Sequence, residues 1–351
     1  MADPTVSVAL VTYNSSRYIE RCLDAVFGQY APLEVVVADN ASTDGTREIL
    51  ERFGDRIRLI LNSSNEGFAE AQNQIIRSTS SEWVLTLNPD VLMRPGFIRK
   101  LVEAGEKDPE AGAVCGKLLS IGPGFRPLKR RIVDSTGLYF TPQMRHFDRG
   151  WHEPDGDRFS RAEYVFGASG AAALYRRGMI GDVAVEGAFF DPDFFFYRED
   201  ADVAWRAQLL GWRCIYTPAA TAFHVRSVSA GDRRSVPPAI NMHSVKNRFL
   251  LRIKNATPDL YRRHWLPMTY RDLLVVGGCF LMEPRSLAAF WKLAGCVPRA
   301  LRARREIMRR RRADDQSVAH WFNSQPASQP LAGAPARERA ARLLASAAGA
   351  S

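Results

Sequence analysis

The sequence predicts an α/β fold in which a mostly parallel central sheet is flanked by helices. Through the first 120 residues, apolar and β-branched segments alternate with segments of helical periodicity. The apolar segments are hydrophobic throughout rather than at every second position, which is typical of strands buried on both faces. Strands that alternate with helices in this way form a parallel sheet covered on both sides.

The elements of this first part follow from their residues in order. Strands are expected at 6–13, 33–40, 56–62 and 82–91, and helices at 16–27, 42–53, 66–78 and 95–105. The helix at 42–53 opens with Ser42 and Thr43, which are capping residues, and the helix at 95–105 opens with a proline, which is favoured in a first turn. Sheets of this kind bind ligands at the carboxyl ends of their strands.

The second part of the chain is less regular. From about 111 to 180 the pattern favours strands and loops, and 141–160, rich in Asp, Arg, His and Gly, is expected to be a mobile excursion. A helix that ends near Gly211 is followed by a short strand entering a loop at 214–227. A flexible loop is expected at 227–240, and a basic amphipathic helix at 244–255.

Composition limits the class of protein and the kind of partner. With 351 residues, 46% hydrophobic and 25% charged, the chain is an ordinary globular protein with a sizeable core. Its formal charge of +10 indicates an anionic partner, such as a nucleic acid, a phosphorylated substrate or an acidic lipid. Five scattered cysteines argue against a disulfide framework or a zinc site. Neither a secretory signal nor a transmembrane run is visible.

Polar side chains follow each of the expected parallel strands, at the carboxyl ends where ligands bind. They are Thr12, Tyr13 and Asn14; Asp39 and Asn40; Asn62, Asn65 and Gly67; and Asn88 and Asp90. Each one alone is explained by a helix cap or a turn. Because four strand ends meet at one edge of the sheet, a pocket is the better interpretation.

Three acids occupy the start of the helix that follows the aromatic run 194–197. Glu199, Asp200 and Asp202 lie within four residues. One acid is enough to cap the free backbone N–H groups and to suit the helix dipole. Carboxylates against aromatic side chains have a raised pKa, which suits a proton acceptor.

Other catalytic motifs are missing. No GxGxxG follows the first strand, the segment at 112–117 has the wrong spacing for a phosphate loop, and no nucleophile elbow is present. What remains is an acidic site without a covalent nucleophile. The oxygen-rich corner at Asn88 and Asp90 suits Mg²⁺ or Mn²⁺ that keeps water and phosphate ligands.

Five segments, in this order and spacing, resemble the family 2 inverting glycosyltransferases with the GT-A fold, and most of all their bacterial rhamnosyltransferase-like branch. They are "VALVTYNSSRYIERCLDAV", "VVVADNASTDGT", "NEGFAEAQN", "LTLNPDV" and "FDPDFFFYREDADVAWRAQLLGW". The resemblance covers about residues 6–255. The QxxRW signature of the processive members is absent, which favours transfer of a single sugar.

The resemblance implies a role for each matching position. Asp200 would be the catalytic base, paired with Glu199. Asp90 would contact the divalent cation and the diphosphate, with His224 as a further metal contact. The nucleotide sugar would contact Thr12, Tyr13, Asn14, Asp39, Asn40, Asn65, Gly67, Asn73 and Asn88. At the position of the family's DxD motif this chain has the sequence Asn-Pro-Asp. One carboxylate of the motif is therefore missing, and weaker metal binding is expected.

The acceptor side is assigned to Trp205, Arg226 and Arg248. Arg226, Lys246 and Arg248 also offer positive charge to a departing diphosphate. For the basic residues a solvated helix face is an equal alternative, for Trp205 a place in the core is another, and for His224 a structural role is also open.

The chain divides into four expected segments. Residues 1–120 form the nucleotide-sugar-binding half of a GT-A domain, and 121–255 form its acceptor-binding and catalytic half. Residues 256–312 form a helical, basic, membrane-associating extension, with eight arginines in 298–312, and 313–351 form a disordered tail. For the arginines we favour adsorption to anionic lipid over a solvated face or nucleic-acid binding, since each basic residue adds on the order of 1 kcal/mol at such a surface.

We therefore expect a metal-assisted, inverting transferase that moves one sugar from a nucleotide diphosphate to a lipid-diphosphate-linked saccharide. L-rhamnose from dTDP-L-rhamnose is the expected donor, cell-envelope polysaccharide synthesis the expected process, and the cytoplasmic face of the membrane the expected location. Two alternatives stay open at this point: a sugar-phosphate nucleotidyltransferase, and a non-catalytic basic binding protein on a degenerate scaffold.

Overall fold

The computed structural model describes residues 5–29, 32–226 and 238–331. Its strands are β1 Val6–Thr12, β2 Leu33–Asp39, β3 Arg58–Leu61, β4 Trp83–Leu87, β5 Val91–Met93, β6 Ala111–Ser120, β7 Val133–Ser135, β8 Leu138–Phe140, β9 His146–Asp148, β10 Glu163–Val165, β11 Ala172–Arg176, β12 Arg213–His224 and β13 Gln329–Pro330. Its α-helices are α1 Ile19–Phe27, α2 Thr46–Glu51, α3 Gly67–Arg77, α4 Phe97–Gly105, α5 Arg177–Val183, α6 Glu199–Leu209, α7 Pro238–Asn255, α8 Pro258–Leu281, α9 Ala288–Arg310 and α10 Asp315–Ala319. Short 3₁₀ turns lie at Gly54–Arg56, Asp157–Phe159, Pro192–Phe194 and Pro284–Leu287.

One mixed sheet forms the centre of the molecule. Its order is β13-β10-β12-β6-β11-β4-β1-β2-β3, with β5 added to β12 and β7 added to β6. The strands β4, β1, β2 and β3 are parallel, as the apolar segments of the first part predict. β11 runs antiparallel between β4 and β6, and β6 is parallel to β12.

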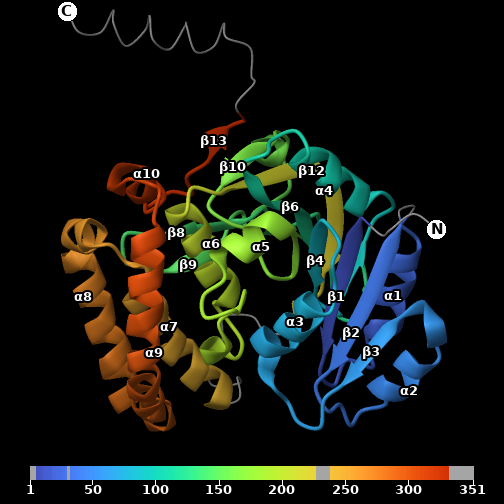
Figure 1. Ribbon diagram of the computed structural model, residues 1–351, viewed down its shortest axis with the longest axis horizontal. Coiled ribbons are helices and arrows are strands. Elements are labelled where there is room, and N and C mark those ends of the chain that lie inside the picture. Colours follow the sequence, from blue (N-terminus) through green and yellow to red (C-terminus); the bar gives the residue numbers. More distant parts are fainter. Residues whose placement is uncertain (1–4, 30–31, 227–237, 332–351) are drawn as a thin grey trace, which may run out of the picture.

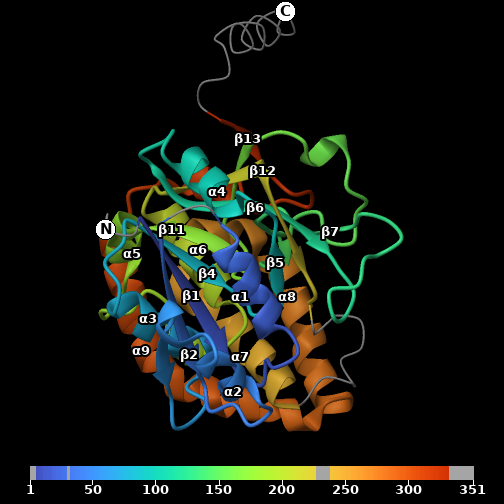
Figure 2. The same ribbon diagram turned by 90° about the vertical axis from the view of Figure 1, so that its right-hand side faces the viewer.

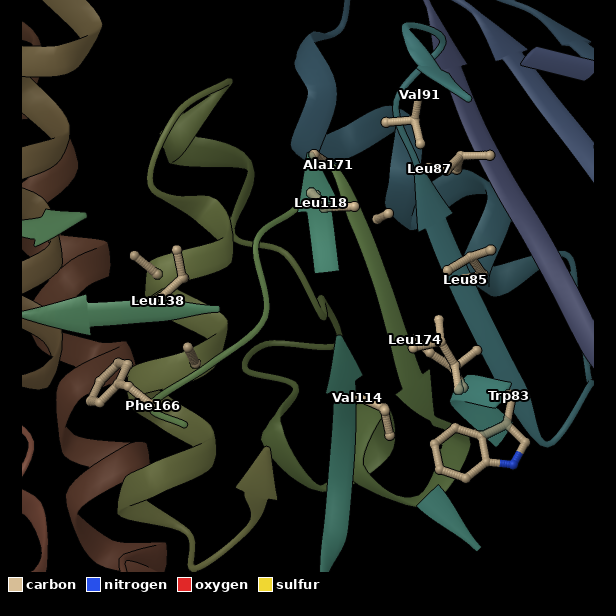
Figure 3. Packing of buried hydrophobic residues seen from close by; sticks show 14 of the residues in the cluster. Trp83, Leu85, Leu87, Val91, Val114, Leu118, Leu138, Phe166, Ala171 and Leu174 are labelled. Atoms are coloured by element: carbon tan, nitrogen blue, oxygen red, sulfur yellow. The ribbon is translucent and has the colours of Figure 1, made fainter. Parts of the chain in front are cut away.

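The core lies on both faces of this sheet. Figure 3 shows Trp83, Leu85 and Leu87 along β4, with Leu174 of the neighbouring β11 beside them. All four side chains are buried, as are the apolar residues of β1 and those of β2 after Leu33. Burial of each large side chain contributes about 1.5–3 kcal/mol, so the apolar strands supply much of the free energy that positions their polar ends.

β12 is much longer than the short strand that its sequence predicts. Its register against β6 shifts between Thr217 and Thr221, and beyond the shift the strand continues to His224. There His224 lies opposite Val91 of β5, and the N–H of Val225 donates to the carbonyl of Asp90 at 3.1 Å. The irregularity therefore carries a histidine to the carboxyl end of β4.

The C-terminal helices form a separate group at one side of the sheet. In Figure 1 α7, α8 and α9 lie on the side opposite α1 and α2, with α8 outermost, and Figure 2 shows the same group from another side. α7 packs against α9 through Met242, Val245 and Ala289. In the described part of the chain, no helix is long and apolar enough to cross a membrane.

Two segments that were expected to be mobile or disordered contain regular secondary structure. The excursion at 141–160 contains β9 and a 3₁₀ turn, and it buries Phe159. Residues 313–331 contain α10 and β13, and Phe322 packs against Phe140 at 5.1 Å between ring centroids. The aromatic side chains of the tail are what hold it, because they bury apolar area on the core. The remainder of the expected tail, 332–351, and most of the expected loop at 227–240 lie outside the described residues.

Candidate active site

An open cavity of about 340 Å³ lies where the end of β4, the end of β12 and the start of α6 meet. It is lined by Phe68, Asn88, Asp90, Leu138, His146, Asp148, Ser169, Gly170, Ala171, Phe196, Tyr197, Arg198, Glu199, Asp200, His224 and Arg226. The side chains singled out from the sequence at 88–90, 199–200 and 224–226 therefore share one cavity, although 138 positions separate the first from the last (226 minus 88).

The paired acids at the start of α6 are held by backbone N–H groups. Asp200 accepts a hydrogen bond from Gly170 N–H through Oδ2 at 2.9 Å and one from Ala201 N–H through Oδ1 at 2.7 Å. Glu199 is buried, and its Oε2 has no hydrogen-bond partner among the described residues. Burial and the charge of Asp200 raise the pKa of Glu199 well above its usual value. Burial also raises the pKa of Asp200. Glu199 is the deeper group and holds a proton more readily.

The loop that leads into these acids has an unusual backbone. Phe195, Tyr197 and Arg198 all have positive φ angles, of 65°, 64° and 75°. Non-glycine residues seldom adopt this conformation, and its cost has to be offset by surrounding contacts. Here Asn247 of α7 donates through Nδ2 to the carbonyls of Phe196 at 2.9 Å and Tyr197 at 2.8 Å.

A chain of alternating charges runs along one wall of the cavity. His224 Nε2 lies 3.3 Å from Asp90 Oδ1, and its Nδ1 lies 2.8 Å from Asp134 Oδ2. Arg226 donates through Nε to Asp134 Oδ1 at 2.8 Å and through Nη2 to Asp148 Oδ2 at 2.6 Å. Each of these charges therefore has an opposite charge beside it.

The charge chain changes how its members bind protons. Burial alone would lower the pKa of His224, but hydrogen bonds and charges from Asp134 and Asp90 raise it to about 9. Burial of Asp134 is outweighed by His224 and Arg226, which lower its pKa. In the isolated chain at neutral pH, His224 is therefore an imidazolium that faces Asp90.

The ends of β1 and β2 form a hydrogen-bonded unit next to this cavity, but they do not line it. Asp39 is fully buried and accepts from Thr12 Oγ1 at 2.9 Å, from Ser42 N–H at 3.0 Å and from Arg47 Nε at 2.7 Å. Although burial opposes it, hydrogen bonds from Ser42, Arg47 and Thr12 lower the pKa of Asp39. Its carboxylate thus already has protein partners.

Several other residues assigned to the nucleotide sugar also bond within the protein. Asn73 bonds the backbone N–H and carbonyl of Phe190 at 2.9 and 2.7 Å, and Asn40 donates to the carbonyl of Gly67 at 3.1 Å. Asn65 accepts from Gly67 N–H at 3.0 Å. Tyr13 differs from them because its side chain is exposed. Asn14 Oδ1 accepts a hydrogen bond from the backbone N–H of Thr43 at 2.9 Å.

Gly67 has a structural reason to be glycine. Its φ is +84°, and a Cβ at this position would lie 2.6 Å from the ring of Phe195. Ala69 N–H donates to the carbonyl of Phe195 at 3.2 Å. Gly67 therefore allows α3 to approach the loop that carries Tyr197, Arg198 and the acids.

Of the three residues assigned to the acceptor, Arg226 lines the cavity and Trp205 does not. The acceptor assignment of Trp205 is wrong: its side chain is 0% exposed and packs against Phe140 at 5.0 Å and Phe322 at 4.9 Å. It lies on the inner side of α6, where core packing determines its place. Arg248 is buried on α7 and is not among the lining residues.

Sequence reasoning missed Asp134, His146, Asp148, Gly170 and Arg198. Asp134 and Asp148 follow apolar residues in short strands, where an acid is unusual, and this was the available signal. Their partners lie 78 to 92 positions away in sequence, so no local spacing links them.

Part of a metal-binding shell is present. Among the described residues no group of three or more His, Cys, Asp or Glu side chains is arranged to hold an ion. Asp90 and His224 nevertheless lie 3.3 Å apart at the cavity, and Asp134 orients the imidazole through its other nitrogen. Such an outer carboxylate is typical of metal-binding histidines. These two side chains fit Mg²⁺ or Mn²⁺ only if water or a bound phosphate supplies the other ligands.

Comparison with known proteins identifies the family. The sequence profile of "Glycosyl transferase family 2" matches residues 7–183, which is half of the chain. The chain belongs to glycosyltransferase family 2. It is 30% identical over 244 residues to the N-acetylglucosaminyl-diphospho-decaprenol L-rhamnosyltransferase of Mycobacterium tuberculosis, an alignment that spans 64% of this chain and 77% of the relative.

Solved structures show the same fold. GalNAc-T7 with UDP, GalNAc and Mn²⁺ superposes with a TM-score of 0.57 at 14% identity, over 72% of this chain and 48% of that protein. S. aureus TarS 1–349 in complex with UDP-GlcNAc superposes with a TM-score of 0.52 at 18% identity, over 87% of this chain and 89% of that one. The GT-A fold expected from the sequence is thus confirmed for this family 2 enzyme.

Proposed function

We propose that this enzyme transfers a single L-rhamnose from dTDP-L-rhamnose to a lipid-diphosphate-linked saccharide, with inversion at the anomeric carbon, in cell-envelope polysaccharide synthesis. The observation that carries the proposal is that Asp200 faces the same cavity as Asp90 and His224. The choice of rhamnose and of a lipid-linked acceptor is supported by the name of the mycobacterial relative, an L-rhamnosyltransferase that acts on N-acetylglucosaminyl-diphospho-decaprenol.

Asp200 is the proposed catalytic base. Its Oδ2 is fixed by Gly170 N–H, so the carboxylate keeps one orientation toward the cavity. The acceptor hydroxyl loses its proton to Asp200 as its oxygen attacks the anomeric carbon from the face opposite the diphosphate. A pKa raised by burial makes Asp200 a stronger base than an exposed aspartate. Glu199, which holds its proton more readily, is proposed to keep the local negative charge low.

The opposite wall of the cavity is proposed to hold the departing diphosphate. Arg226 carries positive charge there, and Asn88 offers an amide N–H₂. Asp90 and His224 would hold Mg²⁺ or Mn²⁺, with the diphosphate and water as the other ligands, and His224 would release its proton when the cation binds. The cation, when bound, supplies charge that stabilises the diphosphate as a leaving group.

The nucleoside is proposed to lie over the ends of β1 and β2, next to the cavity. Since Asp39 already accepts four hydrogen bonds from the protein, we assign it mainly to positioning, and we assign the exposed ring of Tyr13 to the base. An exposed aromatic side chain offers a flat surface on which a pyrimidine stacks. The other residues assigned to the nucleotide sugar bond within the protein, and we propose that they shape this surface: Thr12, Asn14, Asn40, Asn65 and Asn73.

The C-terminal helices are proposed to rest on the cytoplasmic surface of the membrane. Apolar side chains remain exposed along α8 and at the start of α9: Tyr261, Trp265, Leu266, Tyr270, Leu273, Leu274, Phe280, Leu281 and Trp291. Contiguous exposed apolar side chains of this kind mark a partner or membrane surface. Many arginines of 298–312 have partners in the body of the protein, for example Arg299 and Arg302 on Glu186. The apolar face therefore supports the proposal more than the arginines do.

The decisive experiment is a panel of nucleotide sugars incubated with the purified chain, with and without Mn²⁺. The proposal expects dTDP-L-rhamnose to be consumed, and a prenyl-diphosphate-linked N-acetylglucosamine to gain one rhamnose of inverted configuration. Turnover of another nucleotide sugar in its place would overturn the donor assignment, and consumption of none of them would overturn the proposal as a whole.

A further inference from the structure

Four arginines from different parts of the chain lie close enough together beside the cavity for their charges to act on one another. Arg145 precedes β9, Arg198 precedes α6, Arg248 lies on α7 and Arg271 lies on α8. Arg198 lines the cavity itself, together with His146, the neighbour of Arg145. In the residues that the structure describes, no ion pair with an acid is found for Arg145, Arg248 or Arg271, whereas most other arginines of the second half have one.

Hydrogen bonds of the neighbouring residues bring Arg198 and Arg248 together. Asn247 of α7 donates to the carbonyls of Phe196 and Tyr197. Arg248 directly follows Asn247, and Arg198 directly follows Tyr197, so these hydrogen bonds place the two arginines near each other. These two hydrogen bonds tie α7 to the strained loop of the candidate active site.

The second pair is tied to the same place. On α8, Asp272 accepts from Arg252 of α7 at 2.7 Å, which fixes Arg271 beside α7. Arg198 donates through Nη1 to His146 Nδ1 at 3.0 Å, which fixes the turn that carries Arg145. The four arginines therefore lie between the cavity and α8.

The charges of these arginines affect one another. Arg248 is only 7% exposed, and its Nη1 has no hydrogen-bond partner among the described residues. Burial and the charges of Arg198, Arg271 and Arg145 lower the pKa of Arg248 to about 8. Burial and the charges of Arg198, Arg248 and Arg145 hold the pKa of His146 well below its usual value. His146 is thus neutral and accepts from Arg198.

A structural role does not account for such an arrangement. Other buried cations of the same region have partners: Lys254 bonds Asp191 and Asp202, Arg206 bonds Asp202, and Lys246 donates to the backbone carbonyl of Asp193. Burying a cation without a counter-charge costs several kcal/mol, and clustering like charges adds to that cost. A fold tolerates this at a site where an anionic ligand supplies the missing charge.

The position of the cluster indicates which anion. On one side lies the cavity with the proposed base, and on the other lies α8, at the outer edge of the molecule in Figure 1, with exposed Tyr270, Leu273 and Leu274 next to Arg271. We propose that Arg145, Arg198, Arg248 and Arg271 bind the diphosphate of a prenyl-diphosphate-linked acceptor, whose sugar enters the cavity and whose prenyl chain follows α8. This assignment rests on the proposed function, and it places the acceptor diphosphate apart from the donor diphosphate at Asp90 and His224.

Binding is tested by calorimetry on the full chain in EDTA, so that no divalent cation recruits a diphosphate to Asp90. The probes are farnesyl diphosphate, inorganic pyrophosphate and farnesol. Farnesyl diphosphate is expected to bind most tightly, because it offers both the anion and the apolar chain. Arg248→Gln and Arg271→Gln are each expected to weaken its binding about tenfold, as loss of a charge-assisted hydrogen bond does. Arg302→Gln, an exposed arginine of α9 paired with Glu186, is the matched control and leaves binding unchanged.

The outcomes separate the sources of the anion. Pyrophosphate that binds as tightly as farnesyl diphosphate would contradict the lipid-linked ligand, and farnesol that binds equally well would overturn the anion site. Equal binding of farnesyl diphosphate by the unchanged chain and both variants would also overturn it. Folding is checked by the melting temperature, which Arg248→Gln is expected to raise because it removes a buried unpaired charge. None of these measurements needs turnover. If the rhamnosyl transfer assay fails, the binding data therefore still show whether the four arginines bind a prenyl diphosphate.

Discussion

The backbone N–H of Gly170 donates a hydrogen bond to Oδ2 of Asp200 across 2.9 Å. Gly170 immediately precedes Ala171, whose carbonyl accepts from Asn88 N–H at 2.9 Å at the end of β4. The carboxylate of Asp200 at the start of α6 is therefore linked, through the backbone of Gly170 and Ala171, to the segment 88–90 that contains Asp90. This link explains how residues far apart in sequence keep a fixed relation at one cavity.

Asp200→Asn is expected to reduce the transfer rate by about 10²- to 10⁴-fold, which is the usual contribution of a general base. The amide keeps the size of the side chain but does not accept a proton at neutral pH. The measurement is the steady-state rate with nucleotide sugar and acceptor, together with a circular dichroism spectrum to show that the fold is intact. Asp55→Asn, at an exposed position distant in sequence, is the control, and full activity of Asp200→Asn would exclude Asp200 as the base.

Glu199→Gln is expected to raise the melting temperature at neutral and alkaline pH. The folded chain binds the Glu199 proton more tightly than the unfolded chain, because burial and Asp200 raise the pKa of Glu199. The stability that this proton contributes is complete below the unfolded pKa of about 4.3 and is lost as the pH rises toward the folded value. The difference between the variant and the unchanged chain should therefore shrink as the pH falls from 8 to 4.

Differential scanning fluorimetry across that pH range measures the effect. Glu51→Gln changes an exposed glutamate of α2 and serves as the control, with no expected pH-dependent difference. A Glu199→Gln chain that melts lower than the unchanged chain at pH 8 would show that the ionised carboxylate stabilises the fold, contrary to this account.

The sequence allowed the first half of the fold to be predicted, because each element there has a local pattern. β1, β2 and β4 are mainly apolar, β3 is short and partly exposed, and the helices between them keep their periodicity. β12 was expected to be short, since Pro218 and the small residues around it interrupt the apolar pattern. The register shift between Thr217 and Thr221 allows the strand to continue, and a shift of this kind depends on pairing with β6 rather than on local sequence.

The candidate site was predictable where a motif names the residue. Asn88, Asp90, Glu199 and Asp200 share the cavity as expected. Asp134 and Asp148 were missed, because their importance comes from contacts with His224 and Arg226. Trp205 shows the opposite difficulty: a tryptophan has the same local pattern whether it lies in a core or beside a sugar, and only tertiary packing decides.

Asp134→Asn is expected to raise the Mn²⁺ concentration for half-maximal activity by about 10- to 100-fold, as loss of an outer-shell carboxylate does. Asp134 holds Nδ1 of His224 at 2.8 Å, and an amide in its place permits the imidazole to rotate. Removal of the metal with EDTA is expected to stop transfer in both chains, and added Mn²⁺ to restore it. An unchanged Mn²⁺ requirement in the variant would mean that His224 takes no part in metal binding.

Trp205→Ala is expected to lower the free energy of unfolding by about 3–5 kcal/mol, because it leaves a cavity between Phe140 and Phe322. Trp205→Phe should cost much less, since its ring fills most of the space and Trp205 Nε1 has no hydrogen-bond partner among the described residues. Urea denaturation measures both. At a temperature where the Trp205→Phe chain is folded, the KM for the acceptor should be unchanged, and a large rise in that KM would restore the acceptor role.

Leu273→Asp combined with Leu281→Asp is expected to remove most binding to phosphatidylglycerol-containing vesicles at physiological salt. The two side chains are 67% and 86% exposed on α8, so their substitution leaves the core intact, while a charge there opposes insertion into the interface. Leu61→Asp, 53% exposed on β3 at the opposite side of the molecule, is the matched control and should bind vesicles as the unchanged chain does. Vesicle co-sedimentation measures all three chains. Because many arginines of α9 are paired within the protein, binding should depend on the apolar face more than on salt concentration; binding that survives the double substitution and disappears at high salt would assign the membrane contact to the basic residues.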